Sequence, residues 1–387
     1  MNDIDELNEY GYTKLTTHVI NGDYENVKAL IEQGANLDIL KHNKYESALT
    51  TSIIHQYTNI SLLLIEKGAN VNIQNYHGLT PLIIAIGYKQ VKVALAIIDT
   101  ESVDLNIQDN ANYSALIWAV IESWTDKEDC ISIVTALINK NVDIELKDKY
   151  GLTALMNAAQ INNIEIVKLL IDNGANINTQ DYRNGTALTR AISNNCIDIA
   201  EHLINSGANL DNKNSEGCTA LIWSAKCGED RIVKLLIEKG AKVDTQDNEG
   251  NTALMYAVLK SNYNSIKYII DANADLNIKN MYNNTALTHA VYNNNIVTTT
   301  MIIDAVMGTL PEFTDYSLDY HAINTFSNKS DVFNVLTSIP FNTRPSIVSQ
   351  LKRVLTHVYR QLMFHELNRI NLLSVDVINK IVYFLNE

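Results

Sequence analysis

The chain has 387 residues, of which 46% are hydrophobic and 19% charged, a composition typical of a folded, soluble protein. Its formal net charge is −14, and residues 309–387 hold seven basic and seven acidic side chains, so the excess acid lies in residues 1–308. A surface of that sign repels the phosphates of nucleic acids and anionic lipids, so we expect neither nucleic acid nor a membrane as a partner of this region.

The N-terminal segment and the cysteines indicate an intracellular location. Residues 1–6 are acidic and have no apolar core, so they do not resemble a signal peptide. No window of the chain has the ~20 apolar residues of a membrane helix. We therefore expect a soluble protein of the reducing cytoplasm. The cysteines show no Cys-x-x-Cys spacing, which favours buried, reduced thiols at Cys130, Cys196, Cys218 and Cys227.

A tripeptide of Thr or Ser, a small residue and Leu recurs along the chain. Its eight copies are separated by 33, 34, 39, 33, 33, 33 and 33 residues, and Thr13-Lys14-Leu15 is a divergent opening copy. A second marker, Gly-Ala, keeps the same phase, with Asn141-Val142 and Asn273-Ala274 as looser copies. Two markers in phase predict a repeat of about 33 residues. The tripeptides begin at Ser47, Thr80, Ser114, Thr153, Thr186, Thr219, Thr252 and Thr285, and the Gly-Ala pairs at Gly34, Gly68, Gly174, Gly207 and Gly240.

Each marker of the repeat has a physical role that predicts where its helices begin and end. The hydroxyl of Thr153 is placed to cap the first helix, which stabilises a helix by about 1 kcal/mol. Gly174 falls where a left-handed residue ends the second helix. Ala158 is small enough for neighbouring helices to approach closely, and the apolar residues of 166–171 give the second helix a buried stripe. One repeat cannot bury both of its faces, so we expect stability to come from stacking.

The best copy, residues 148–159 and 166–176, resembles the ankyrin repeat. The resemblance implies an all-α solenoid in which each repeat is a short hairpin tip followed by two antiparallel helices. It implies about nine repeats in residues 1–308, of which the first and the last are divergent. The family's Thr-Pro-Leu-His motif is weakened, because only Thr80-Pro81-Leu82 keeps the proline and other residues replace the histidine. This change loosens the expected bonding between the turn and the helix but leaves the predicted fold unchanged.

The fourth repeat is six residues too long, and the surplus lies near the polar stretch Trp124–Asp129 between its two helices. Two interpretations stay open: a solvated loop extension without a role, or a protruding finger that helps to grip a partner, because insertions in solenoids map to one face. The preceding repeat has lost its Gly-Ala marker. We therefore expect a local kink at residues 99–130.

Residues 309–387 carry no repeat marker and are predicted to form a helical C-terminal region. One helix is expected from Arg344-Pro345-Ser346 onward, and a last short helix after Leu373. The last segment resembles the start of an F-box, with Ser374 where a proline belongs and without the length of a full F-box. That resemblance implies recruitment of a host ubiquitin ligase through its adaptor, whereas the alternative is a helix that only caps the solenoid. The residues in register with the F-box are Leu373, Asp376, Val377, Ile381, Phe384 and Leu385.

The sequence shows no catalytic or metal-binding motif. It contains no Gly-rich phosphate loop, His-Glu-x-x-His motif, nucleophile elbow or kinase set. Residues 211–217 faintly resemble a calcium loop, but the acidic position twelve is missing and the segment is one of the polar hairpins. We therefore expect no enzymatic activity, no cofactor and no metal.

In ankyrin proteins the hairpin tips and the exposed face of the first helix form the partner surface, and this resemblance selects thirteen positions here. Tyrosine is frequent among them, and tyrosine is enriched at interfaces because it offers a large contact area at a low entropic cost. Trp118, Trp223 and Tyr256 lie at an inner helical position, where we expect them to pack in the core. The tip residues are Tyr76, His77, Tyr113, Lys149, Tyr150, Tyr182, Arg183, Glu216, Glu249 and Tyr282, and the first-helix residues are Tyr88, Lys226 and Tyr292.

The sequence as a whole therefore predicts a monomeric scaffold that binds a partner protein through the concave face of the repeats. The alternative is a substrate adaptor whose C-terminal helix recruits a ubiquitin ligase. The even array and the Asn- and Ile-rich composition resemble the ankyrin-repeat proteins of giant amoebal viruses, which implies a host protein as partner and the host cytoplasm as location. An intracellular bacterium or an amoebal host would suit the same composition.

Overall fold

The computed structural model describes residues 3–40, 46–122, 126–293 and 295–307. The chain divides into two compact units, residues 1–209 and 210–387. Within the described residues the regular structure is helical, apart from an isolated antiparallel bridge between Gln108 and Ser114. The predicted all-α architecture is confirmed.

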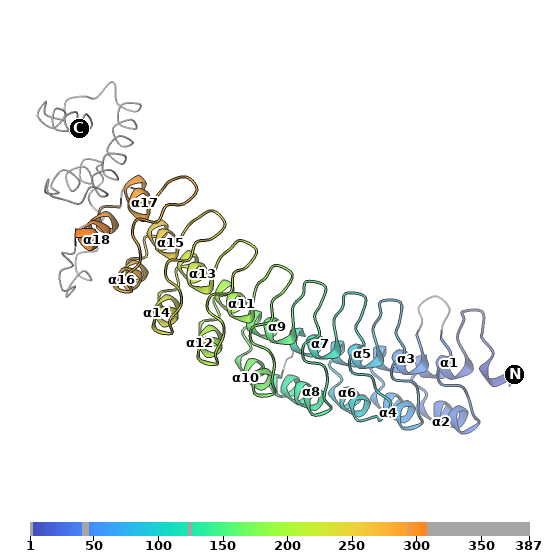
Figure 1. Cartoon of the computed structure of the whole chain (residues 1–387). Coiled ribbons are helices and arrows are strands. Elements are labelled where there is room, and N and C mark those ends of the chain that lie inside the picture. Colours follow the sequence, from blue (N-terminus) through green and yellow to red (C-terminus); the bar gives the residue numbers. More distant parts are fainter. Residues whose placement is uncertain (1–2, 41–45, 123–125, 294, 308–387) are drawn as a thin grey trace, which may run out of the picture. The chain divides into compact units, whose positions relative to one another are not determined.

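The described helices form nine antiparallel pairs, one pair for each predicted repeat (Figure 1). The first unit contains the 3-10 helix η1 (Asp3–Asp5) and α1 (Lys14–Ile20), α2 (Tyr24–Glu32), α3 (Ala48–Ile54), α4 (Thr58–Glu66), α5 (Pro81–Gly87), α6 (Val91–Ile98), α7 (Ala115–Ile121), α8 (Lys127–Asn139), α9 (Ala154–Gln160), α10 (Ile164–Asp172), α11 (Ala187–Ser193) and α12 (Ile197–Asn205). The second unit contains α13 (Ala220–Cys227), α14 (Asp230–Glu238), α15 (Ala253–Leu259), α16 (Tyr263–Asp271), α17 (Ala286–Tyr292) and α18 (Ile296–Met307).

The first helix of every pair begins at the predicted hydroxyl cap. In the fifth repeat the Thr153 side chain accepts a hydrogen bond from the backbone N–H of Met156, which satisfies one of the free N–H groups of the first turn. Where threonine replaces the family's histidine, the bonding is not loosened but doubled: Thr189 Oγ1 also accepts from the N–H of Thr186 at 2.8 Å. The same cap is formed by Thr13, Ser47, Thr80, Ser114, Thr186, Thr219, Thr252 and Thr285.

The second helices followed by a Gly-Ala marker or a looser copy of it end as predicted, at a residue in the left-handed conformation, whereas α6, which has no marker, ends without such a residue. Gly174 has φ +88°, and the looser markers Asn141 and Asn273 adopt the same conformation with φ +58° and +60°. Glycine and asparagine enter this region at the lowest steric cost, so both versions of the marker end the helix.

The core lies between the helices of successive repeats. Ala158 is fully buried, and the predicted stripe of the second helix buries Ile166, Val167 and Leu170, whereas Leu169 and Ile171 are half-buried. First helices stack on first helices, from α1 to α11 in the first unit and from α13 to α17 in the second (Figure 1). Each repeat therefore buries its apolar faces against its neighbours, as stacking requires.

Part of the six-residue insertion in the fourth repeat is helical. The helix α8 has 13 residues, whereas α10 has nine, and it begins at Lys127 with Asp126 capping the N–H of Glu128. The expectation of a polar loop was therefore wrong for residues 127–129, which form the first turn of α8, and residues 123–125 lie outside the described residues. Contacts of α5 with α7 and of α6 with α8 continue the stacking across the segment where a kink was expected.

The predicted C-terminal region, residues 309–387, lies outside the described residues. Its expected helices, its F-box-like end and the domain boundary at residue 308 stay predictions.

Candidate binding surface

The hairpin tips of neighbouring repeats are joined to one another by backbone hydrogen bonds. In the first unit, the N–H of Lys149 donates to the carbonyl of Ala111 at 3.0 Å and that of Tyr182 to the carbonyl of Tyr150 at 3.2 Å. In the second unit, the N–H of Met281 donates to the carbonyl of Glu249 at 3.0 Å. The tips of each unit consequently form one edge that projects beside the first helices (Figure 1).

Each described tip from the third repeat onward begins with an Asp or Asn that closes the turn. Asp148 shows the arrangement: its Oδ1 accepts from the N–H groups of Tyr150 at 2.8 Å and Leu152 at 2.9 Å. Such side-chain turns fix the tip backbone without help from the residues between. The equivalent residues are Asn75, Asp109, Asp181, Asn214, Asp247 and Asn280.

The aromatic side chains with the highest exposed fractions lie on the tips. Tyr150 is 56% exposed and Tyr182 is 69% exposed, and Tyr76 and Tyr282 are exposed to a similar degree. The ring of Tyr182 packs against Gly151, where an added Cβ would lie 2.9 Å from it. The ring of Tyr182 is therefore held against the neighbouring tip although most of its surface is exposed.

Of the thirteen residues predicted for the partner surface, Tyr113 and Lys226 are half-buried and the others are exposed. We call this set the tip surface. In the first unit it comprises Tyr76, His77, Tyr88, Tyr113, Lys149, Tyr150, Tyr182 and Arg183, and in the second Glu216, Lys226, Glu249, Tyr282 and Tyr292.

The structure adds exposed apolar side chains that the sequence reasoning missed. Ile161 is 45% exposed and Leu259 40% exposed, and both lie where a first helix ends, in the register of Tyr88 and Tyr292. Met281 is 64% exposed on the last described tip. Counting seven or eight residues from each capping hydroxyl would have found Ile161 and Leu259.

The expectation that Trp118, Trp223 and Tyr256 lie in the core was wrong, since all three are half-buried. They occupy the fourth position after the cap, on the helix face that turns towards the hairpin. Trp118 Nε1 donates to Asp109 Oδ2 at 2.9 Å, and the Tyr256 hydroxyl donates to Asp247 Oδ2 at 2.7 Å. Trp118 and Tyr256 therefore support the tip, whereas Trp223 Nε1 is buried and has no hydrogen-bond partner.

A cation lies between two aromatic rings in the second unit. Lys226 Nζ is 4.9 Å from the ring centre of Trp223 and 5.4 Å from that of Tyr256, and it is 3.0 Å from Glu216 Oε2. Burial lowers the pKa of Lys226, but the hydrogen bond and the charge of Glu216 outweigh it, so the pKa is raised. The amine is therefore charged, and it holds Glu216 and the two rings together.

The described cysteines are thiols. Cys130, Cys196 and Cys218 are buried as predicted, whereas Cys227 is exposed, so the prediction was wrong for this residue because it lies at the outer end of α13. Burial raises the pKa of Cys130 and of Cys218 to about 11. Both are therefore protonated at neutral pH.

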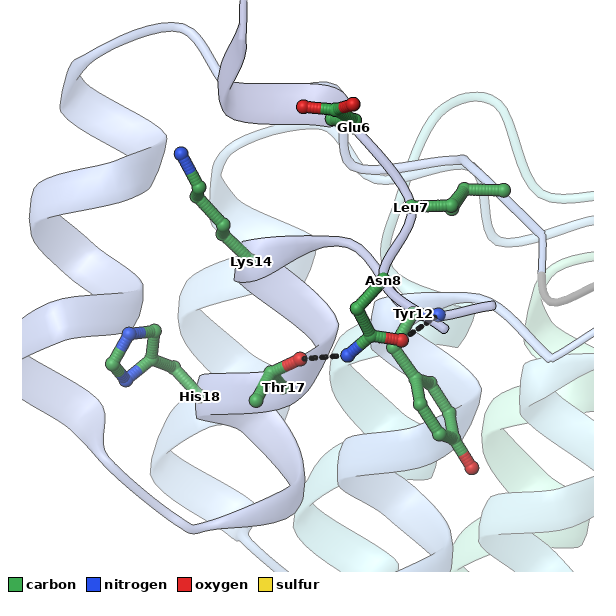
Figure 2. Close-up of a pocket in the computed structure, with 7 residues that line it drawn as sticks. All are labelled: Glu6, Leu7, Asn8, Tyr12, Lys14, Thr17 and His18. Carbon is green, nitrogen blue, oxygen red and sulfur yellow. Dashed lines mark hydrogen bonds between the residues drawn. The ribbon is translucent and has the colours of Figure 1, made fainter. Parts of the chain in front are cut away.

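A shallow cavity of about 470 Å³ lies in the first repeat (Figure 2). It is formed by the same two parts as the tip surface, a hairpin and the first helix, and Asn8 Nδ2 donates to Thr17 Oγ1 at 3.4 Å across it. Six of its seven lining residues have a polar side chain. The lining residues are Glu6, Leu7, Asn8, Tyr12, Lys14, Thr17 and His18.

Within the part of the chain that the structure describes, no group of three or more His, Cys, Asp or Glu residues is arranged to hold a metal ion. None of the described helices is both long and apolar enough to cross a bilayer.

Two family models match the chain, over more than half of its 387 residues together. One, described as ankyrin repeats in three copies, matches residues 123–214 and 206–280, and the other, described as ankyrin repeats in many copies, matches residues 64–119. Among solved structures, the ankyrin repeat domain of Bcl-3, described as a unique member of the IkappaB protein family, is 27% identical with a TM-score of 0.51. That similarity covers 59% of this chain and 99% of the Bcl-3 chain. A comparison with curated protein sequences finds no match.

Proposed function

We propose that this chain, which belongs to the ankyrin-repeat family, is a non-catalytic scaffold that binds a partner protein through its tip surface. The observation that carries the proposal is the row of exposed tyrosines on tips whose backbone is already fixed. Tyr150 and Tyr182 expose more than half of their surface although each could have been replaced by a small polar residue without loss of the turn.

Fixed aromatic side chains favour protein binding for a thermodynamic reason. Association costs free energy for each side chain that has to be ordered, and a ring already held against its neighbour has less freedom to lose. Tyrosine also buries a large apolar area while its hydroxyl can bond to the partner. Exposed Ile161 adds apolar area to the tip surface of the first unit, and exposed Leu259 and Met281 add it to that of the second unit.

The first test is a pull-down from cell lysate with the full chain and with two variants, quantified by mass spectrometry. The double substitution Tyr150→Ala and Tyr182→Ala removes two tip rings, and Tyr24→Ala removes an exposed tyrosine of α2 as the matched control. We expect the same proteins with the wild-type chain and the control and at least a tenfold loss with the double variant, which corresponds to about 1.4 kcal/mol. Retention by the double variant at an unchanged melting temperature would show that the tip surface is not the binding site.

The ligase-adaptor alternative rests on residues 373–385, which lie outside the described residues, and it stays a prediction. It is tested in the same experiment by a chain that ends at Asn371. A ligase adaptor retrieved by the full chain and absent with the shortened one would support it. The likeness to giant-virus proteins, and with it a host partner and a location in the host cytoplasm, also stays a prediction.

A further inference from the structure

One carboxylate beneath the tip surface lacks a partner for one of its oxygens. Asp148 is 1% exposed, and its Oδ1 accepts the two backbone bonds of the turn. Its Oδ2 is also buried and has no hydrogen-bond partner. A buried carboxylate oxygen without a donor is unfavourable, because the charge has left water without a replacement bond.

The other tip aspartates of the described repeats have such a donor. The oxygen Oδ2 accepts from Trp118 Nε1 in the fourth repeat, from Arg190 Nε at 3.0 Å in the sixth and from the Tyr256 hydroxyl in the eighth. In each case the donor is the fourth residue after the capping hydroxyl. In these three repeats the position therefore supplies a long donor side chain to the tip aspartate.

The fifth repeat has a short side chain at this position. Asn157 is in register with Trp118 and Arg190, and its Nδ2 donates to the carbonyl of Thr153 at 3.1 Å. The amide is consequently used within its own helix and leaves Asp148 Oδ2 without a donor. Asparagine is also much smaller than arginine, tryptophan or tyrosine, so the fifth repeat has less side-chain bulk at this position than the fourth, sixth and eighth repeats.

The unpaired carboxylate lies under the most aromatic part of the tip surface. Tyr150 follows two residues later and is 56% exposed, and Ile161 is 45% exposed at the end of the same first helix. Burial and, second, the charge of Asp148 raise the pKa of Tyr113, so this phenol lies within electrostatic reach of the carboxylate. A buried carboxylate oxygen without a donor thus lies in the tip that also presents the exposed ring of Tyr150.

We propose that an arginine of the partner protein enters beside Asn157 and donates to Asp148 Oδ2, in the way that Arg190 donates to Asp181 one repeat later. This inference rests on the proposed function, because it names the chemistry that the tip surface receives. A guanidinium group suits the position because it offers several N–H donors in a fixed plane and stacks on aromatic faces. The net charge of −14 also draws cationic segments towards the chain.

Entry of the arginine requires a local rearrangement. Oδ2 is buried in the free chain, so the side chains that cover it have to move before a guanidinium group can reach it. The arginine then forms a charge-assisted hydrogen bond with Asp148 Oδ2, and no existing hydrogen bond of that oxygen has to break.

The test uses two synthetic pools of dodecapeptides that are identical in their randomised flanks. One pool has arginine at the centre, and the other has citrulline, its neutral isostere. Both are applied to the immobilised full chain, and retention is measured by mass spectrometry. We expect the wild-type chain to retain the arginine pool about tenfold better, and the substitution Asp148→Asn to remove that preference.

The matched control is Asp109→Asn, which removes an equal charge from a carboxylate whose Oδ2 already has a partner. Both substitutions are compatible with the fold, because Asn214 occupies the same place in the seventh repeat with both turn bonds intact. We expect the control to keep the preference for arginine. Equal retention of the two pools by the wild-type chain, or an equal loss with both variants, would overturn the inference and leave only general charge attraction.

A second variant supplies the missing donor for Asp148 Oδ2 from the chain itself. Asn157→Arg should pair with Asp148 as Arg190 pairs with Asp181, so we expect a higher melting temperature and loss of the preference for arginine peptides. The gain in melting temperature should vanish when Asp148→Asn is added. No gain from Asn157→Arg would contradict the proposed geometry.

The failure of this inference is distinguishable from failure of the proposed function. If Tyr150→Ala with Tyr182→Ala weakens retention of both pools while arginine and citrulline are retained equally, the tip surface binds and the arginine assignment is wrong. If the tyrosine substitutions change neither pool, the tip surface itself is not the binding site.

Discussion

The pair of Arg190 and Asp181 offers a direct measure of what the fourth position after the cap contributes to the fold. The Asp181 side chain is completely buried, whereas that of Arg190 is 29% exposed. Removing one partner of a buried ion pair costs about 3–5 kcal/mol, and the partial exposure of Arg190 lets water reach the site, so we expect Arg190→Met to cost about 2–3 kcal/mol. Methionine keeps the length of the side chain, so the loss reports the bond more than the packing.

The double variant Arg190→Met with Asp181→Asn isolates the interaction. Asparagine keeps the turn, as Asn214 and Asn280 show, and removes the buried charge. The loss in the free energy of unfolding of the double variant should therefore be smaller, by about 1–2 kcal/mol, than the sum of the losses of the two single variants. Urea denaturation followed by circular dichroism measures the free energies, and Arg183→Met, on an exposed tip residue, is the control. A loss below about 0.5 kcal/mol for Arg190→Met would refute the reasoning, because that is the range of ordinary surface substitutions.

Three further predictions follow from the same geometry. Thr153→Ala should lower the free energy of unfolding by about 1 kcal/mol, while Thr153→Ser, which keeps the capping oxygen, should change it little in urea denaturation. The methyl group of Gly174→Ala would meet no atom within 4 Å, so this variant should lower the free energy of unfolding by about 1 kcal/mol, through its left-handed backbone alone. The methyl group of Gly151→Ala would also lie 2.7 Å from a backbone nitrogen, so this variant should lower the free energy of unfolding clearly more in the same urea denaturation. Burial, together with the hydrogen bond to a carboxylate, raises the pKa of Tyr256 above its ordinary value of 10.0, so the folded chain keeps this proton where the unfolded chain loses it. Stability should therefore fall as the pH rises above about 10, and Tyr256→Phe should reduce that slope in denaturation curves recorded between pH 8 and 11.

The repeat architecture could be predicted from the sequence because its signals are local. The hydroxyl of Thr153 caps a helix that starts one residue later, and Gly174 ends a helix that stops two residues earlier. Neither signal depends on what a distant segment does. The exposed tip tyrosines were predictable for the same reason, since a residue at the end of a hairpin has few neighbours that can cover it.

The inner positions could not be predicted in the same way. Whether Trp118 turns towards the core or towards the hairpin depends on how closely the neighbouring first helices approach, which no local pattern records. The unpaired oxygen of Asp148 is a further example, because it results from the combination of a turn residue with an amide nine residues later. The extension of α8 into the expected polar stretch depends on the cap at Asp126, a residue that the repeat period does not mark.

The bonds that join the tips have a consequence for how this chain changes over evolutionary time. The contacts between Lys149 and Ala111, and between Tyr182 and Tyr150, use only main-chain atoms, and the turn itself is closed by the preceding aspartate or asparagine. A mutation at these outward-facing positions to any residue other than proline therefore leaves the bonding of the tip intact and alters only what the tip presents. Under the proposed function, single substitutions at the tips would change the partner preference without loss of the turn, and the number of repeats sets how many such substitutions can accumulate independently.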